Sequence, residues 1–200
     1  MSKVLILAQH DGATINQGTA KAVTAAKHIS GAVIDLVVFS DDVATIAAEA
    51  SKLADVNSVH AVSTGKDQWK LAAGIAPKIA ELAADYTHVF GPSTTFGKDV
   101  MPCVAALLGL NQISDIMQVI DAKTFKRPIY AGNAVITVNA PQDKIVATIR
   151  TASFKTNDMN SGSATIENHD NNNEQTDTKF VELKSGNSER PDLQTAAKVV

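Results

Sequence analysis

Short, almost unbroken apolar runs alternate with helix-period segments through the first half of this 200-residue chain. Such runs are typical of a parallel sheet that is covered on both faces, because its strands carry apolar side chains on both sides. The predicted strands are residues 3–9, 33–40, 58–63 and 87–91. Repeated strand–helix–strand units connect through right-handed crossovers. The pattern therefore predicts an α/β fold with an open, mostly parallel sheet and helices on both faces.

The helical segments lie between and after these strands, at residues 15–29, 43–54, 71–82 and 97–108. Gly31 is a stop signal for the first of them, and Asp41 or Asp42 is the expected N-cap of the second. Pro77 argues against one uninterrupted helix in the third, because proline has no amide N–H to donate. We expect a second piece there, with Pro77 in its first turn.

The pattern changes after Gly109 to short strands with tight connections and no room for helices. This stretch predicts an antiparallel β-meander that follows the α/β part of the fold. Its expected strands are Asp115–Ile120, Thr124–Ala131, Ala134–Asn139 and Lys144–Arg150.

The domain organisation is predicted from composition. Residues 1–156 form the N-terminal α/β domain, and residues 157–178 form a polar loop or linker within it. Residues 168–175 contain no apolar side chain and cannot bury enough surface to offset the entropy of ordering. Residues 179–200 are a final strand, over Lys179–Leu183, and a linker. Because Ala196–Val200 looks like the opening of another strand, we expect a further domain to follow.

Charge and composition exclude several classes of function. The net charge is -3, so neither nucleic acid nor an anionic membrane is an expected partner. No apolar run approaches the roughly 20 residues that span a bilayer. Residues 1–8 are too short for a signal peptide and predict a first buried strand, so we expect a cytoplasmic protein. Cys103 is the only cysteine and is expected to be a small core residue, with no internal disulfide.

The strongest local candidate for a binding site is the loop Gly91–Lys98, between the fourth strand and its helix. Ligands bind at such junctions because free backbone N–H groups point there. The loop differs from a phosphate loop, since five residues separate Gly91 from Gly97 and Asp99 replaces the Mg²⁺-binding hydroxyl. The alternative is a plain turn in which Ser93, Thr94 or Thr95 caps the helix.

The remaining polar residues do not form a recognisable active site. No G-x-G-x-x-G motif follows a strand, and no G-x-S-x-G elbow supports a triad of Ser93, His88 and Asp115. His10-Asp11-Gly12 predicts a polar loop with Gly12 at a positive φ, or else a ligand contact. The histidines are scattered and predict no zinc site: His10, His28, His60, His88 and His169. We therefore expect no catalytic residue in this chain.

Several stretches taken together resemble the alpha subunit of electron-transfer flavoproteins. Their order and spacing cover nearly the whole chain. They are residues 4–10, Thr95–Asp99 with Pro102, Ile113–Ile116, Arg127–Ala134, Arg150–Phe154 and Arg190–Leu193.

The resemblance implies an electron carrier rather than an enzyme. Members of the family are heterodimers with a beta subunit, hold one FAD, and carry AMP in the beta subunit. They pass electrons from acyl-CoA dehydrogenases of fatty acid β-oxidation, and from other flavin dehydrogenases, to a quinone oxidoreductase. Their main FAD contacts come from a C-terminal domain, which a glycine-rich stretch opens after the equivalent of Lys198–Val200. The resemblance therefore implies no FAD-binding residue and no bound cofactor in this fragment.

For this stretch of chain, the resemblance implies a scaffold that packs against a similarly folded beta subunit. The expected partner surfaces are the meander and two loops, whose residues are Gly91, Ser93, Thr94, Thr95, Phe96, Gly97, Lys98, Ser114 and Asp115. Two other interpretations stay open. One is a stand-alone α/β nucleotide-binding module, and the other is an assembly domain without a ligand.

Overall fold

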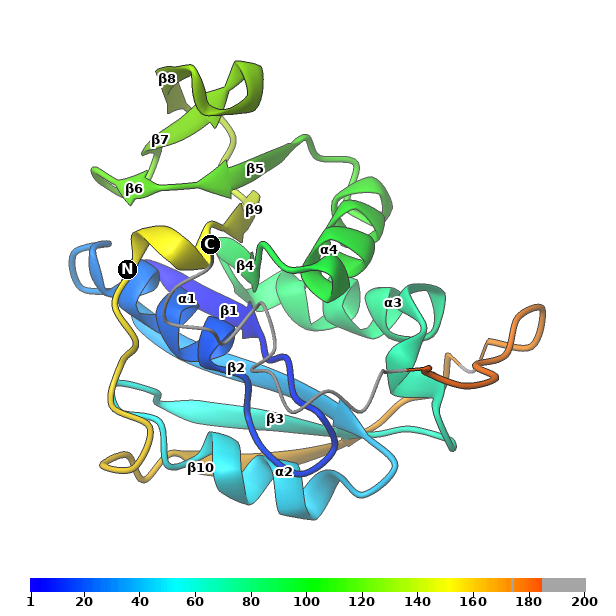
Figure 1. The fold of residues 1–200 in the computed structure, drawn as a ribbon. Helices are drawn as coiled ribbons and strands as arrows, with labels where there is room; N and C mark the ends of the chain where they lie inside the picture. The colour runs from blue at the N-terminus through cyan, green and yellow to red at the C-terminus, as the bar shows by residue number, and fades with distance from the viewer. Residues whose placement is uncertain (174, 185–200) are drawn as a thin grey trace.

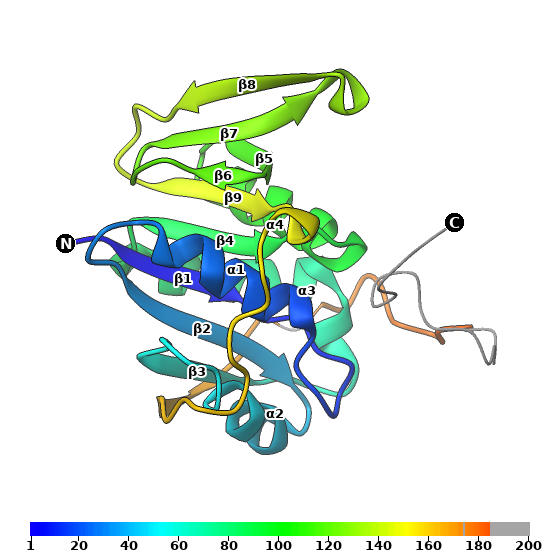
Figure 2. The same ribbon diagram turned by 60° about the vertical axis from the view of Figure 1, so that its left-hand side comes forward.

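The computed structural model describes residues 1–173 and 175–184. Its main element is a seven-stranded sheet of order β10-β3-β2-β1-β4-β9-β5, in which all neighbouring strands run parallel (Figure 1). A separate antiparallel sheet has the order β6-β7-β8 and lies at the top of Figure 2. The strands of the main sheet are β1 Lys3–Leu7, β2 Val33–Ser40, β3 Ser58–Ser63, β4 His88–Pro92, β5 Gln112–Ile116, β9 Ile145–Ile149 and β10 Thr165–Asp170. Those of the small sheet are β6 Gln118–Val119, β7 Thr124–Ile129 and β8 Ala134–Asn139.

Helices cover both faces of the main sheet, as the sequence predicted. Two hydrophobic clusters lie on opposite faces because successive strand residues point to opposite sides. One cluster joins the sheet to α1 and α2, and the other joins it to α3 and α4. The helices are α1 Gln17–Lys27, α2 Val43–Ala50, α3 Ala72–Leu82 and α4 Thr95–Leu107. The predicted α/β fold with a β-meander is therefore confirmed.

One strand of the predicted meander belongs to the main sheet instead. Lys144–Arg150 was expected to be the last antiparallel strand, but β9 lies between β4 and β5 and runs parallel to both. All five residues of β9 are buried, as suits an interior strand, whereas the residues of β8 alternate between half-buried and exposed. The first strand predicted for the meander, Asp115–Ile120, is divided into β5 and β6. Asp115 has a φ of 61°, and the chain passes from the main sheet to the small sheet after Ile116.

The predicted break at Pro77 is wrong. Helix α3 continues through this residue. Proline removes only one hydrogen bond here, the one that the carbonyl of Ala73 would have accepted. Ala73 is exposed, so water can bind that carbonyl instead. Packing of Ile75 and Ile79 against the sheet keeps the helix continuous.

The polar segment 157–178, expected to be a loop or linker, contains the edge strand β10. An edge strand needs only one neighbour, and β10 pairs with β3 along its whole length. Its side chains are almost all exposed, so a polar sequence costs little there. In contrast, the structure has no strand over Lys179–Leu183, which was predicted to be one. The predicted start of a strand at Ala196–Val200 lies outside the described residues.

No helix in the described part of the chain is both long enough and apolar enough to cross a membrane.

Candidate functional site

The loop Gly91–Lys98 connects β4 to α4 at the carboxyl end of the sheet. Thr94 is the N-cap of α4, and its hydroxyl oxygen accepts a hydrogen bond from the amide of Gly97 at 3.2 Å. The same hydroxyl donates to Oε1 of Gln9, which follows β1, at 2.7 Å. Of the three cap candidates, the structure selects Thr94. Its hydroxyl joins the β4–α4 loop to the end of β1, and its single donor is used in the fold.

The backbone of this loop is folded tightly against β4. A Cβ at Gly97 would lie 1.9 Å from the carbonyl oxygen of Pro92, and a Cβ at Gly91 would lie 2.7 Å from Cγ of Met101. Gly97 therefore requires glycine for steric reasons, whereas a Cβ at Gly91 would force the buried side chain of Met101 to move. A phosphate cradle needs several free N–H groups facing an open concavity. The close contact between Gly97 and Pro92 leaves no such concavity between them.

The other predicted residues of the loop have different surroundings. The amide of Ser93 donates to the carbonyl of Ile149 at 2.7 Å, so the loop is attached to the end of β9. Oγ of Ser93 is buried and has no hydrogen-bond partner within the described residues. Phe96 packs against the α3–α4 hydrophobic cluster, whereas Thr95 and Lys98 are exposed. Only these last two side chains are freely available to a partner.

Ser114 and Asp115 lie at the carboxyl end of β5, where the strand has an irregular register. A carboxylate oxygen of Asp115 accepts from Nη1 of Arg150 at 2.9 Å, and its amide donates to Oγ1 of Thr148, also at 2.9 Å. The carbonyl of Ser114 accepts from Nε of Arg127 at 2.7 Å. This loop is therefore held by β9 on one side and by β7 on the other.

The two predicted loops flank the end of β9. The amide of Ser93 contacts the carbonyl of Ile149 on one side, and the amide of Arg150 donates to the carbonyl of Ile116 on the other, at 2.8 Å. Both loops thus lie on one edge of the molecule, as expected of strand ends in a parallel sheet. Sequence reasoning gave no such role to the residues that hold them: Gln9, Arg127, Thr148 and Arg150. All but Thr148 lie in stretches that carry the family resemblance, but no local motif indicates these contacts.

The imagined triad of Ser93, His88 and Asp115 does not form. His88 and Ser93 stand at opposite ends of β4, about 16 Å apart at the usual rise of a strand. Asp115 is paired with Arg150 rather than with a histidine. The described residues of these loops therefore offer no nucleophile with an adjacent base.

The loop after β1 forms the wall of a pocket at the same end of the sheet. Gly12 has a φ of 101°, as the sequence predicted for a polar turn. Nε2 of His10 donates to the carbonyl of Phe39 at 2.8 Å, and its Nδ1 accepts from the amide of Gly12 at 3.1 Å. The pocket has a volume of about 380 Å³ and is lined by Gln9, His10, Asp11, Thr14, Ile15, Asn16, Gln17 and Met159.

His10 is expected to make the stability of the protein depend on pH. Burial lowers the pKa of His10 below the ordinary value of 6.5, and the hydrogen bond to Phe39 opposes this shift only in part. The unfolded chain therefore binds a proton on His10 at a higher pH than the folded chain does. As pH falls below about 6.5, the free energy of unfolding should fall, by at most about 1.4 kcal/mol per pH unit for this residue.

The variant His10→Gln isolates this contribution. The difference in unfolding free energy between the wild type and this variant should shrink as pH falls from about 7.5 to about 5.5, measured by urea titration. Trp69, the only tryptophan, stacks on the ring of His10 with centroids 4.4 Å apart, so its fluorescence reports on this site directly. A difference that is constant over this range would contradict the prediction.

Comparison with known proteins places the chain in a family. The electron transfer flavoprotein domain matches residues 4–174. The electron transfer flavoprotein subunit alpha of Pseudomonas aeruginosa is 40% identical over 197 residues, which are 98% of this chain and 63% of that protein. The subunit alpha of Paracoccus denitrificans is 41% identical over 152 residues, 76% of this chain and 49% of that protein.

A mitochondrial relative gives the same result. The mitochondrial electron transfer flavoprotein subunit alpha of Dictyostelium discoideum is 35% identical over 214 residues, 100% of this chain and 60% of that protein. The chain thus spans between about half and two thirds of the length of these relatives. It belongs to the electron transfer flavoprotein family, in which it corresponds to the N-terminal domain of an alpha subunit.

Proposed function

We propose that this chain is the N-terminal scaffold of an electron transfer flavoprotein alpha subunit and that its three-stranded sheet binds the beta subunit. The observation that carries the proposal is the apolar, only partly covered surface of β6-β7-β8. Exposed apolar patches on a protein of otherwise ordinary composition mark interaction sites. The names of the relatives support the assignment to an alpha subunit.

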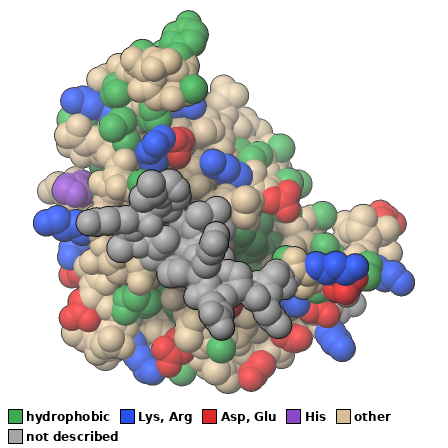
Figure 3. Space-filling view, in the orientation of Figure 1, with side chains coloured by type: hydrophobic (Ala, Val, Ile, Leu, Met, Phe, Trp, Pro, Cys, Tyr) green, Lys and Arg blue, Asp and Glu red, His purple; other side chains and the backbone are tan. Residues whose placement is uncertain are grey.

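Three large apolar side chains are exposed on β8 and on the turns that flank the strands of the small sheet. Tyr130 is 79% exposed, Val135 52% and Ile120 46%. Figure 3 shows hydrophobic side chains on the outside of the molecule at the top of the view, where this sheet lies. Tyr130 and Ala131 also have positive φ values of 50° and 54°. A bend with two such residues places a large aromatic side chain at the end of the sheet, where it can enter a pocket on a partner.

Strand β8 is an open edge in the described part of the structure. It pairs with β7 alone, so its other side has unpaired N–H and C=O groups. None of its six residues is fully buried, although Val135, Ile136 and Val138 are strongly apolar. Free edges accept a strand or a flat surface from another chain. A partner on β8 would bury these side chains and satisfy the backbone together.

The electron-transfer role would belong to the assembled protein. FAD would be bound outside this chain, AMP would lie in the beta subunit, and electrons from acyl-CoA and other dehydrogenases would pass to a quinone oxidoreductase. This chain would supply the platform and bind no flavin alone. The closure of the loop at Gly97 and the use of Thr94 as a cap support a structural role for the Gly91–Lys98 loop.

The variant Val135→Asp tests the partner surface. We expect it to weaken binding of the cognate beta subunit at least tenfold, because a carboxylate would be desolvated in an apolar interface. Stability should change little, since Val135 is half exposed. The measurement is co-purification of the co-expressed subunits, followed by titration calorimetry of the separated chains.

Ile166→Glu is the matched control. Ile166 is 42% exposed on β10, which is one edge strand of the main sheet; the other edge strand is β5. This variant should bind the beta subunit like the wild type. If both variants bind equally well, the small sheet is not the interface.

A further inference from the structure

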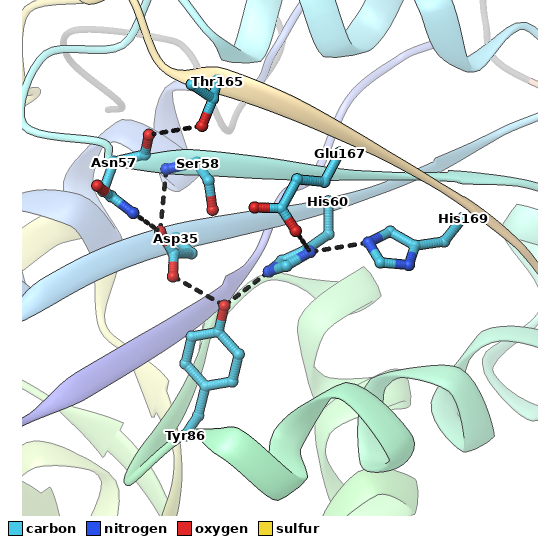
Figure 4. A network of polar contacts seen from close by, with 8 residues as sticks. All are labelled: Asp35, Asn57, Ser58, His60, Tyr86, Thr165, Glu167 and His169. Atoms are coloured by element: carbon cyan, nitrogen blue, oxygen red, sulfur yellow. Dashed lines mark hydrogen bonds and ion pairs between the residues drawn. The ribbon is translucent and has the colours of Figure 1, made fainter.

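His60, Glu167 and His169 form a cluster at the edge of the main sheet, away from the loops described above. Each offers one ligand atom, and these three atoms lie within 4.8 Å of one another. The strand register explains the arrangement, because Glu167 pairs directly with His60 and His169 lies two residues further along β10. Figure 4 shows the three side chains meeting on one side of β3 and β10.

A chain of hydrogen bonds from Asp35 through Tyr86 holds the ring of His60 at its Nε2 atom; we call this chain the relay. Oδ1 of Asp35 accepts from the amide of Ser58 and from Nδ2 of Asn57, both at 2.9 Å. Oδ2 of Asp35 accepts from the hydroxyl of Tyr86 at 2.8 Å. The hydroxyl proton is therefore committed to Asp35, and the tyrosine oxygen accepts from Nε2 of His60 at 2.6 Å. His60 is buried, which favours the neutral ring. In that ring the proton is on Nε2, and Nδ1 carries the lone pair.

The lone pair of Nδ1 faces two further electron donors. Nε2 of His169 lies 2.9 Å away, and Oε2 of Glu167 lies 3.5 Å away. A hydrogen bond from His169 can satisfy Nδ1, but His60 then has no proton to offer Glu167. A single cation between the three atoms satisfies all of them at once.

We propose that Nδ1 of His60, Nε2 of His169 and Oε2 of Glu167 bind one divalent transition-metal ion of the Zn²⁺ class. Two imidazoles and one carboxylate, with solvent in the fourth position, are ligands that such ions take readily. The indirect link from His60 to the buried carboxylate of Asp35, through Tyr86, is the kind of support that metal-binding histidines have.

Two of the three separations are close to those of such a site, and the third, between Glu167 and His169, is within 4.8 Å and can be adjusted by rotation of the exposed Glu167 side chain. Tetrahedral Zn²⁺ with bonds of about 2.0–2.1 Å places its ligand atoms about 3.3 Å apart. The separation between Glu167 and His60 is close to this value, and that between the two histidines must increase by about 0.4 Å. Strand β10 can supply this shift because it has only one neighbour. The side chain of Glu167 is 54% exposed, so an ion can enter from solvent.

A metal ion here would attach the edge strand to the rest of the sheet. β10 buries almost none of its side chains and is held to β3 mainly by backbone hydrogen bonds. Ligands from both strands would join them through the ion. Binding to the folded state alone raises stability in proportion to the logarithm of the metal concentration.

The experiment is a Zn²⁺ titration of the untagged 200-residue chain after treatment with a chelator. We expect one equivalent to bind with a Kd of about 10 μM or tighter, by calorimetry, with a rise in Tm that is reversed by the chelator. Co²⁺ should give the visible absorption of a four-coordinate site. Amide hydrogen exchange should slow in residues 165–170 when Zn²⁺ is bound.

Substitutions assign the ligands. His169→Gln and Glu167→Gln are on the exposed edge and should fold normally, but each should weaken Zn²⁺ binding at least tenfold. His28→Gln, at an exposed histidine beyond the end of α1, should leave it unchanged. The proposal is overturned if the wild type shows no saturable binding up to about 100 μM Zn²⁺. It is equally overturned if the His169 and Glu167 variants bind Zn²⁺ as the wild type does.

Discussion

Replacing Gly97 with alanine is expected to lower the free energy of unfolding by about 3 kcal/mol or more. The new Cβ would lie 1.9 Å from the carbonyl oxygen of Pro92, a distance at which the backbone must move. Neither group can rotate away, because Pro92 is paired in β4 and Gly97 belongs to α4. Movement would also disturb the cap of Thr94 and its bond to Gln9. Urea unfolding followed by circular dichroism measures the effect.

Gly109→Ala is the control for this prediction, because it lies just beyond the other end of α4. Gly109 has a φ of +66°, but no atom lies within 4 Å of the position that its new Cβ would take. Only the conformational cost of a left-handed residue applies, about 1 kcal/mol. Equal losses in the two variants would show that the contact with Pro92 is not the cause.

Replacing Asp35 with alanine is expected to cost about 3–5 kcal/mol. Asp35 is 5% exposed and accepts hydrogen bonds from Tyr86, Ser58 and Asn57. Its removal leaves the hydroxyl of Tyr86 and the amide of Ser58 buried without an acceptor. Desolvation of two such groups, rather than the loss of the carboxylate itself, accounts for the size of the effect. Thermal unfolding monitored by calorimetry measures it.

Asn57→Ala provides the comparison. It removes one donor to the same carboxylate from an exposed residue, and should cost less than about 1 kcal/mol. An Asp35→Ala variant no less stable than Asn57→Ala would mean that water replaces the missing acceptor. In that case the relay to His60 would not be rigid.

The sequence predicts the part of the fold that depends on local pattern. The first four strands and the helices between them are confirmed, because burial on both faces leaves continuous apolar runs. Strand β9 was assigned to the wrong sheet, since its sequence neighbours are antiparallel strands and its spatial neighbours are parallel ones. Strand β10 was missed because an edge strand with exposed side chains has the composition of a loop.

The Gly91–Lys98 loop does lie between β4 and α4, as the sequence indicated, but its contacts were not predicted, and its role as a partner surface stays a prediction. A glycine at each end of a strand-to-helix junction marks the loop around Thr94, and the structure gives Gly97 a steric reason. Its partners depend on the order of the strands, which periodicity does not contain. Gln9 and Arg150 are ordinary polar residues in sequence, and only the placement of β1 and β9 beside β4 brings them to the loops. The cluster at His60 was invisible for the same reason.

The strand order also constrains how a nascent chain can fold. Strand β3 acquires its outer neighbour only when residues 165–170 have been synthesised, about a hundred residues later. Strand β4 likewise waits for residues 145–149, because β9 separates it from β5. Until then both strands have an open edge in an otherwise apolar sheet. Unpaired backbone groups at such edges promote association between incomplete chains. Such long-range pairing favours slow, late closure of the sheet. A chaperone would therefore help this protein most between the emergence of β4 and the emergence of β10 from the ribosome.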